Sequence, residues 1–369
     1  MRTLIFLIAL CSYAFASDGW EKTDVHPVVP LTHPTIEQKL EQTDISDGYS
    51  FVIFGDQRAQ ADGSWQAMIG EIAELNKEAD YLFVMDTGDI NNQGRYSDQF
   101  HRLHEILAPL NDLPYLVGVG NHEISYNQHL VARENCARFL SYLDPSLSAE
   151  KLYYKKVIGD VRYLFLDGTD LVVGDNCELE YPDGPVAGSR GEKQMEWLVN
   201  ELADESYEIT FVMEHFPFLQ TSSIHRDEAR TLWDYKYNGV TFPDILLNAN
   251  VDVFITGHTH TFEILELTRI EDNASLSIVN ISGKPSGTPG SIRGMRRRGI
   301  DIRGQEDQWF SERGWDTTGY SIKQPQVMTG PEEANQFVVI TVMPDGSVIS
   351  WAHFMDSEDV RISNAVMLR

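Results

Sequence analysis

The sequence predicts an α/β (α+β) fold, in which strands and helices alternate, rather than an all-β protein. Short apolar runs, typical of buried strands, alternate with segments whose apolar residues recur at helical spacing. The chain has 369 residues, of which 42% are hydrophobic and 11% aromatic. A chain of this length and composition can bury one large core or two smaller ones, and alternating elements pack as layers.

The predicted elements follow one another from residue 49 to residue 353. Strands are expected at 49–54, 81–85, 115–119, 209–214, 251–256, 262–267 and 276–281, and in two hairpins, 152–158 with 161–166 and 337–342 with 347–353. Helices are expected at 65–77, 97–110 and 191–203. Residues 283–333 show no periodicity, so they are expected to form either a functional lid or a poorly ordered loop.

Residues 1–16 have the pattern of a cleaved signal peptide, which predicts a secreted or periplasmic protein. Arg2 supplies the positive end, and Ala14-Phe15-Ala16 fits the cleavage site. Cys11 leaves a lipid-anchored precursor as an alternative. No apolar run reaches about 18 residues, so no membrane span is expected. Residues 17–47 are expected to form a polar leader and 48–369 one domain, with a basic loop insertion at about 283–333.

The chain is strongly acidic, with a formal net charge of -27. Such a surface repels duplex nucleic acid and anionic membranes, and nothing in the sequence indicates a partner protein. A site for an anionic substrate must therefore concentrate positive charge locally. Cys136 and Cys177 remain after residue 16, and they either pair in an oxidising compartment or stay as buried thiols.

Polar clusters that contain metal-binding residue types follow five of the predicted strands. The residues are Asp56, Asp89, Asn121, His215, His258 and His260. Ligands bind at the carboxyl ends of strands in open α/β sheets, so these side chains are expected to converge on one crevice. Carboxylate, amide oxygen and imidazole suit divalent metals such as Mn, Fe and Zn. Taken singly, each Gly-Asp also fits a turn, Asn121 also fits a helix N-cap, and His215 also fits a core histidine.

The order of the clusters resembles the calcineurin-like metallophosphoesterases. The matching motifs are Gly55-Asp56, Gly88-Asp89 with Gly94, Gly120-Asn121-His122-Glu123, His215 and Gly257-His258-Thr259-His260. The resemblance implies a two-sheet β-sandwich flanked by helices that hydrolyses phosphate esters of small molecules. It does not separate phosphomonoesterases from phosphodiesterases. The rival hypothesis is a non-catalytic metal- or phosphate-binding module on the same fold.

The resemblance also implies a role for each matching residue. Asp89 would bridge two divalent metals, Asp56 and His260 would complete the first site, and Asn121, His215 and His258 would complete the second. His122 would contact the phosphate or protonate the leaving oxygen, while a metal-bound hydroxide attacks phosphorus.

Two positions depart from the family pattern. The first motif of the family is usually Asp-x-His, whereas this chain has Asp56-Gln57-Arg58. Arginine has no lone pair for a metal, so the first site is expected to be weak or empty. Arg58 either binds the phosphate or forms a salt bridge with a ligand carboxylate. The second departure, Asn92 in place of an Asp, indicates small-ester or nucleotide hydrolysis rather than protein dephosphorylation.

A basic segment lies within the non-periodic stretch. Between Lys284 and Arg313 there are seven cations and four acids, an unusual surplus in so acidic a chain. Arg296, Arg297 and Arg298 are candidates to bind substrate, and Trp309 and Trp315 are candidates to stack on a base or sugar. The alternative is an irregular loop with solvated arginines.

Overall fold

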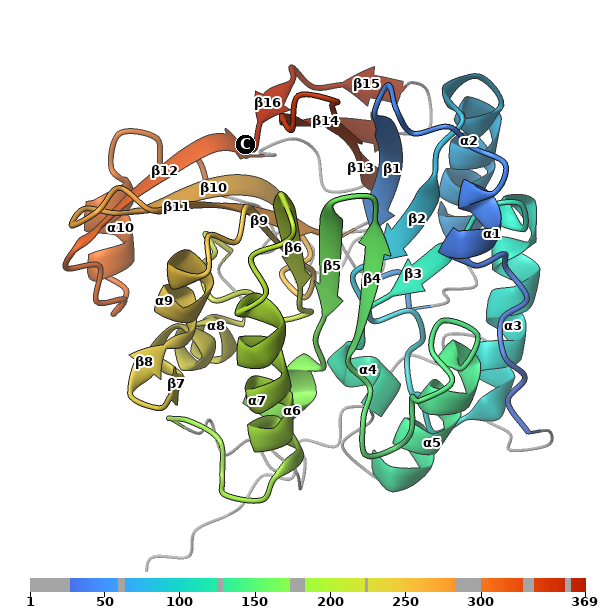
Figure 1. The fold of residues 1–369 in the computed structure, drawn as a ribbon, viewed down its shortest axis with the longest axis horizontal. Helices are drawn as coiled ribbons and strands as arrows, with labels where there is room; N and C mark the ends of the chain where they lie inside the picture. The colour runs from blue at the N-terminus through green and yellow to red at the C-terminus, as the bar shows by residue number, and fades with distance from the viewer. Residues whose placement is uncertain are drawn as a thin grey trace, which may run out of the picture.

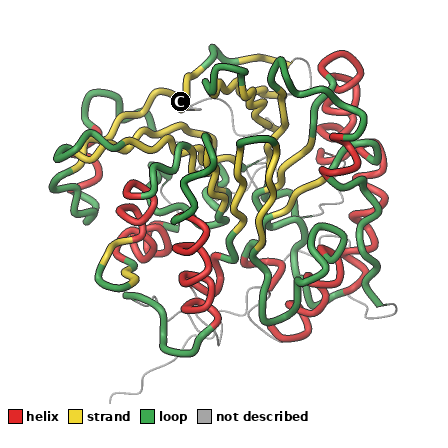
Figure 2. Tube along the Cα trace, viewed as in Figure 1, coloured by secondary structure: helices red, strands yellow, loops and turns green. Residues whose placement is uncertain are grey.

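The computed structural model is a sandwich of two mixed sheets with helices on both outer faces (Figures 1 and 2). It describes residues 27–58, 64–124, 129–172, 183–222, 225–282, 300–327, 335–355 and 360–369. Within these ranges no helix is both long and apolar enough to cross a bilayer. The architecture confirms the predicted fold class.

The first sheet contains the three strands that carry the first polar clusters. Its order is β15-β14-β13-β1-β2-β3, with β16 paired to β14. The bounds are β1 Tyr49–Phe54, β2 Phe83–Asp86, β3 Tyr115–Val117, β13 Asn335–Val342, β14 Val348–Met355, β15 Val360–Ile362 and β16 Val366–Met367. Because β1, β2 and β3 are parallel, their carboxyl ends lie at one edge of the sheet.

The second sheet contains the two strands that carry the histidine clusters. Its order is β12-β10-β11-β9-β6-β5-β4. The bounds are β4 Tyr154–Ile158, β5 Val161–Phe165, β6 Ile209–Met213, β9 Val253–Thr256, β10 Phe262–Arg269, β11 Ser275–Ile281 and β12 Tyr320–Val327. Strands β5, β6, β9 and β11 are parallel neighbours. An isolated bridge between Val119 and Asp167 joins the chain just beyond β3 to the chain just beyond β5.

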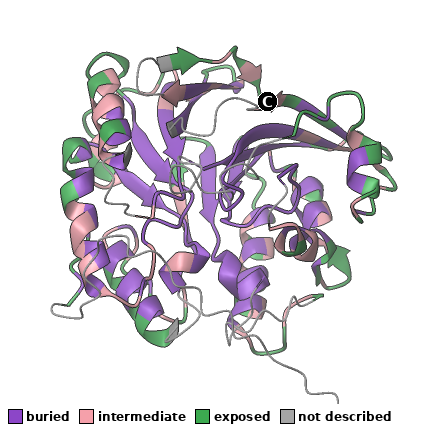
Figure 3. Cartoon of the chain, turned by 180° about the vertical axis from the view of Figure 1, so that it is seen from behind, coloured by how far each residue is buried: buried purple, intermediate pink, exposed green. Residues whose placement is uncertain are grey.

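The facing sides of the two sheets hold an aromatic core. Phe51 stacks on Phe83 with ring centroids 4.4 Å apart, and Tyr163 stacks on Phe211 at 4.8 Å. The two pairs meet edge to face, with Tyr163 5.4 Å from Phe83. Contacts of this kind contribute about 0.5–1.5 kcal/mol each beyond the area they bury. The buried strands of this core run through the centre of Figure 3.

Helices cover the outer faces, and the small hairpin of β7 (Lys236–Tyr237) and β8 (Val240–Thr241) lies beside them. Their bounds are α1 Ile36–Leu40, α2 Ser64–Ala79, α3 Ser97–Leu107, α4 Asn121–Ile124, α5 His129–Leu140, α6 Gly168–Val172, α7 Arg190–Leu202, α8 Arg226–Asp234, α9 Phe242–Asn248 and α10 Glu306–Ser311, with a 3₁₀ turn at Ala108–Leu110. Helices α2 and α3 pack on the outer face of the first sheet and belong to the same cluster as the core between the sheets, whereas α7, α8 and α9 enclose a second core on the other side of the second sheet.

Two predictions about irregular segments need correction. The stretch 283–333, predicted to lack regular structure, contains α10 and β12. Strand β12 is an edge strand paired only with β10, so it tolerates Pro325 within it and gives no clear apolar alternation. The described part of the predicted leader, 27–47, packs onto the main core through Val28, Leu31 and Ile36.

Candidate metal centre

The predicted ligands lie together where the carboxyl ends of strands from the two sheets meet. Asp56 and Asp89 follow β1 and β2 of the first sheet, whereas His215 and the His258/His260 pair follow β6 and β9 of the second. All six side chains are buried, with exposed fractions between 0% and 7%. The N–H of His258 donates to both carboxylate oxygens of Asp56, at 3.2 and 3.0 Å. This contact joins the two sheets at the site.

The backbone at the site is strained, which indicates that the side chains are held in place by their surroundings. Left-handed φ values occur at Asp56 (60°), Arg58 (54°), Asp89 (56°), His258 (66°) and His260 (55°). Residues with side chains rarely adopt this conformation, and such strain concentrates at functional sites. Close approach also requires glycine at Gly257, where an added Cβ would lie 2.8 Å from Asp56 Oδ2.

The second metal position has ligand atoms at suitable spacing. His215 Nε2 lies 3.4 Å from Asp89 Oδ1 and 3.3 Å from His258 Nδ1. Atoms that share a divalent metal at about 2.1 Å from each are separated by about 3–3.5 Å. Asn121 Oδ1 is buried and has no hydrogen-bond partner among the described residues. Asp89, His215 and His258 therefore fit a divalent metal, and Asn121 offers a free oxygen as a fourth candidate ligand.

Protonation states at this position also suit a metal. Burial and the neighbouring His225 and His215 rings hold the pKa of His258 well below its usual range, which keeps its lone pairs available. Burial opposes ionisation of Asp89, but its interactions with His122, His215 and the Arg58 guanidinium, together with the hydrogen bond from the His122 N–H, outweigh burial and lower the pKa of this carboxyl. Asp89 is therefore an anion, as a carboxylate that binds a metal must be.

The first metal position differs, because Arg58 reaches into it. Arg58 Nη2 donates to Asp89 Oδ2 at 3.0 Å and lies 3.0 Å from His260 Nε2. The sequence allowed two interpretations of Arg58, a phosphate contact or a salt bridge with a ligand carboxylate. The structure contains the salt bridge, with Asp89 as the partner. The amide of Gln57 donates to the Gly55 carbonyl at 3.3 Å.

His122 lies beside the two metal positions without belonging to either. Its Nδ1 hydrogen bonds to the carbonyl oxygen of Asn92 at 2.7 Å, and its Nε2 lies 3.7 Å from Asp89 Oδ2. The main chain of Asn92 therefore orients this ring. Burial and the charge of Arg58 lower the pKa of His122 to about 4.

Glu123 joins two of the motifs, a role that the sequence gave no reason to assign. Its Oε2 accepts the backbone N–H groups of Asp89 and Gly120 at 2.7 and 2.9 Å, and its Oε1 accepts that of Asn91 at 3.1 Å. The side chain is fully buried. Glu123 therefore fixes the loop after β2 against the loop after β3.

Replacing Glu123 by glutamine is expected to lower the free energy of unfolding by about 1–3 kcal/mol. Both oxygens accept from backbone N–H groups, so the new amide nitrogen must face a donor. Urea unfolding of the metal-free protein measures the change, with Glu105→Gln on the exposed side of α3 as the matched control. A change no larger than that of the control contradicts this role.

His225 is a further residue of the site that the sequence did not reveal. Its ring centroid lies 4.0 Å from that of His258 and 6.2 Å from that of His260, and its Nδ1 lies 3.5 Å from Glu228 Oε1. His225, Glu228 and His258 offer ligand atoms close enough together to hold a cation, as do Asp56, Asp89 and His215. A lone histidine in a polar loop has no sequence signal of its own, since only the fold brings it beside His258.

The basic segment is only partly described. Lys284, Arg293 and the candidates Arg296, Arg297 and Arg298 lie outside the described residues. The proposed stacking role of the two tryptophans is wrong. Trp315 is buried and donates its Nε1–H to the Phe218 carbonyl at 3.0 Å, and Trp309 is 8% exposed beneath Arg313. Both belong to the second core.

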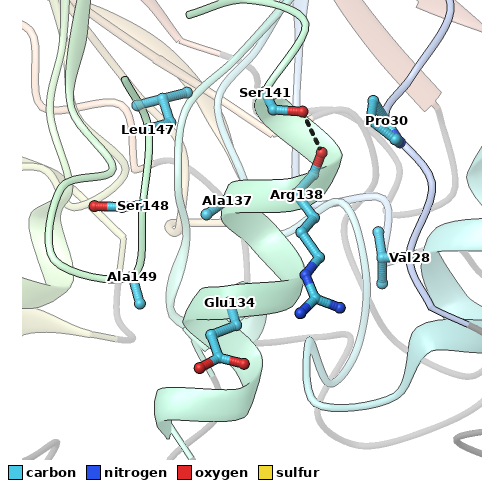
Figure 4. Close-up of a pocket in the computed structure, with 9 residues that line it drawn as sticks. All are labelled: Val28, Pro30, Glu134, Ala137, Arg138, Ser141, Leu147, Ser148 and Ala149. Atoms are coloured by element: carbon cyan, nitrogen blue, oxygen red, sulfur yellow. Dashed lines mark hydrogen bonds between the residues drawn. The ribbon is translucent and has the colours of Figure 1, made fainter. Parts of the chain in front are cut away.

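Two other features lie outside the centre. A cavity of about 310 Å³ is lined by the leader, α5 and the loop that follows it (Figure 4), namely by Val28, Pro30, Glu134, Ala137, Arg138, Ser141, Leu147, Ser148 and Ala149. None of these is a predicted site residue. Cys136 of α5 is a buried free thiol, and Cys177 lies outside the described residues.

Comparison with known proteins agrees with the motifs. Purple acid phosphatase 22 of Arabidopsis thaliana is 28% identical over 58% of this chain and 44% of its own length. Purple acid phosphatase 21 of the same plant is 28% identical over 51% of this chain and 39% of its own length. The chain thus covers less than half the length of these curated relatives.

Solved structures support the fold. The purple acid phosphatase PPD1 from yellow lupin (Lupinus luteus) seeds superposes with a TM-score of 0.56 at 15% identity, over 87% of this chain and 53% of that one. GAP50, the anchor in the inner membrane complex of Plasmodium, superposes with a TM-score of 0.54 at 14% identity. The match covers 87% of this chain and 88% of that one. The profile of the calcineurin-like phosphoesterases matches residues 23–262, well over half of the sequence. The chain therefore belongs to the calcineurin-like phosphoesterase family.

Proposed function

We propose that the protein is an exported, metal-dependent hydrolase of phosphate esters on small substrates. The observation that carries the proposal is the convergence of Asp89, His215 and His258 at ligand spacing, with the buried Asn121 Oδ1 unpartnered among the described residues and with His122 beside Asp89. A divalent Mn, Fe or Zn ion bound there would supply Lewis acidity to the phosphoryl group and an activated water. Export rests on the pattern of residues 1–16, which N-terminal sequencing of the mature protein tests.

The side chains around the metal position would divide the remaining work. Arg58 carries a permanent positive charge toward phosphoryl oxygens, and His122 contacts the phosphate or protonates the leaving oxygen. His225 is a third candidate to contact the substrate because it lies on the His258 side of the centre. Arg296, Arg297 and Arg298 are proposed to attract the anionic substrate electrostatically.

The test is hydrolysis of a nitrophenyl phosphate monoester and of its bis-ester after chelation and resupply of Mn, Fe or Zn. We expect turnover of at least one ester that is lost on chelation and restored by metal. His258→Ala should abolish it, whereas His104→Ala, on α3 away from the centre, should not. Metal binding without turnover of either ester would instead favour the non-catalytic binding module.

A further inference from the structure

The structure contains a cation of the protein itself at the first metal position. One nitrogen of Arg58, Nη2, is 3.0 Å from Asp89 Oδ2 and 3.0 Å from His260 Nε2. Arginine only donates hydrogen bonds, so His260 Nε2 must accept with its lone pair. The guanidinium therefore engages two of the lone pairs that a metal at this position would need.

The backbone holds Arg58 in this place. Its N–H donates to the Asp89 carbonyl at 2.8 Å, and its φ of 54° is in the left-handed region. Such a conformation is uncommon for a long side chain and persists where the surroundings impose it. The side chain is 18% exposed, and its Nη2 contacts the buried Asp89 and His260, so this nitrogen of the head lies inside the site.

Asp56, the third predicted ligand of the first metal, already accepts hydrogen bonds from two groups of the protein. Ser282 Oγ donates to Asp56 Oδ2 at 2.6 Å, and the His258 N–H donates at 3.0 Å. Hydrogen bonds from the protein thus stabilise this carboxylate, and a metal is not needed to compensate its burial.

A permanent cation and a divalent metal repel each other at such short range, and burial weakens the screening between them. We propose that the Arg58 guanidinium takes the place of the first metal, so that the centre binds one divalent metal, at the second position. Arg58 then supplies the other positive charge to phosphoryl oxygens, as arginines do in phosphoryl transfer. The inference rests on the proposed function only for the metal at the second position.

Metal stoichiometry tests this inference without reference to turnover. The full chain is loaded with Mn²⁺, passed over a desalting column, and analysed for metal per chain by mass spectrometry. We expect about one metal in the unaltered protein and about two in Arg58→His, which supplies the imidazole that the family pattern has at this position. Arg102→His, an exposed arginine of α3, should stay at about one.

Electron paramagnetic resonance of the Mn²⁺-loaded, unaltered protein gives a second readout that needs no variant. An isolated Mn²⁺ ion is expected, whereas the spectrum of an exchange-coupled pair would overturn the inference. So would two metals in the unaltered chain, or one metal in a folded Arg58→His. Absence of metal from both chains contradicts the metal centre itself, which separates failure of the proposed function from failure of this inference.

Discussion

Replacing His122 by alanine is expected to lower kcat by about 10²–10⁴-fold, the usual contribution of a positioned proton donor. The metal content should not change, because no predicted ligand set includes His122. The reason lies in its placement, since Asn92 O holds Nδ1 at 2.7 Å and leaves Nε2 directed toward the centre, 3.7 Å from Asp89 Oδ2. His104→Ala serves as the control, because His104 contacts Val29 O and Phe139 away from the centre.

The identity of the leaving group separates the two roles proposed for His122. With a pKa of about 4 the substrate-free ring is neutral at neutral pH, so a bound phosphate anion must raise this pKa before the ring can donate a proton. If His122 protonates the leaving oxygen, the loss in His122→Ala is larger for alkyl esters than for nitrophenyl esters. An equal loss for both indicates a phosphate contact. No loss for either contradicts both roles.

The positions of the candidate ligands are predictable because each follows a strand with a strong local signal. Apolar runs such as 49–54 and 209–214 identify buried strands, and the motifs at their ends supply ligands in a characteristic order. Parallel strands then bring these ends to one edge of the fold. This part of the site depends on local pattern and topology, both of which a sequence contains.

The contacts that the sequence does not reveal join distant residues. The salt bridge of Arg58 was one of two interpretations, but its contact with His260 spans 202 residues, and the contact of Glu123 with Asp89 spans 34. The spacing of apolar residues within a helix or strand carries no information about such pairs. The tryptophans of the basic segment were misassigned for a related reason. Trp309 and Trp315 lie among arginines in the sequence, but the fold buries them in the second core.

A comparison of the two central aspartates is expected to show that only one is essential for metal binding. Asp89→Asn should reduce metal affinity by more than the 10–100-fold typical of residues that merely support a ligand. Its Oδ1 is 3.4 Å from His215 Nε2 at the second position, and its Oδ2 accepts from Arg58. The variant therefore weakens the metal site and leaves the guanidinium without its carboxylate partner.

Asp56→Asn should keep most of the metal, since Asp56 lies 3.5 Å from His260, which Arg58 contacts, and accepts hydrogen bonds from Ser282 and the His258 N–H. The asparagine introduced at position 56 keeps one side-chain oxygen, which can accept from the His258 N–H. The Ser282 hydroxyl can accept from the new NH₂ group. Titration of each variant with Mn²⁺ by calorimetry measures both affinities. Equal losses at the two positions would mean that both aspartates bind metal, and would contradict the asymmetry that Arg58 imposes on the centre. A large loss in Asp89→Asn with a small one in Asp56→Asn is the outcome that a single metal beside a fixed arginine requires.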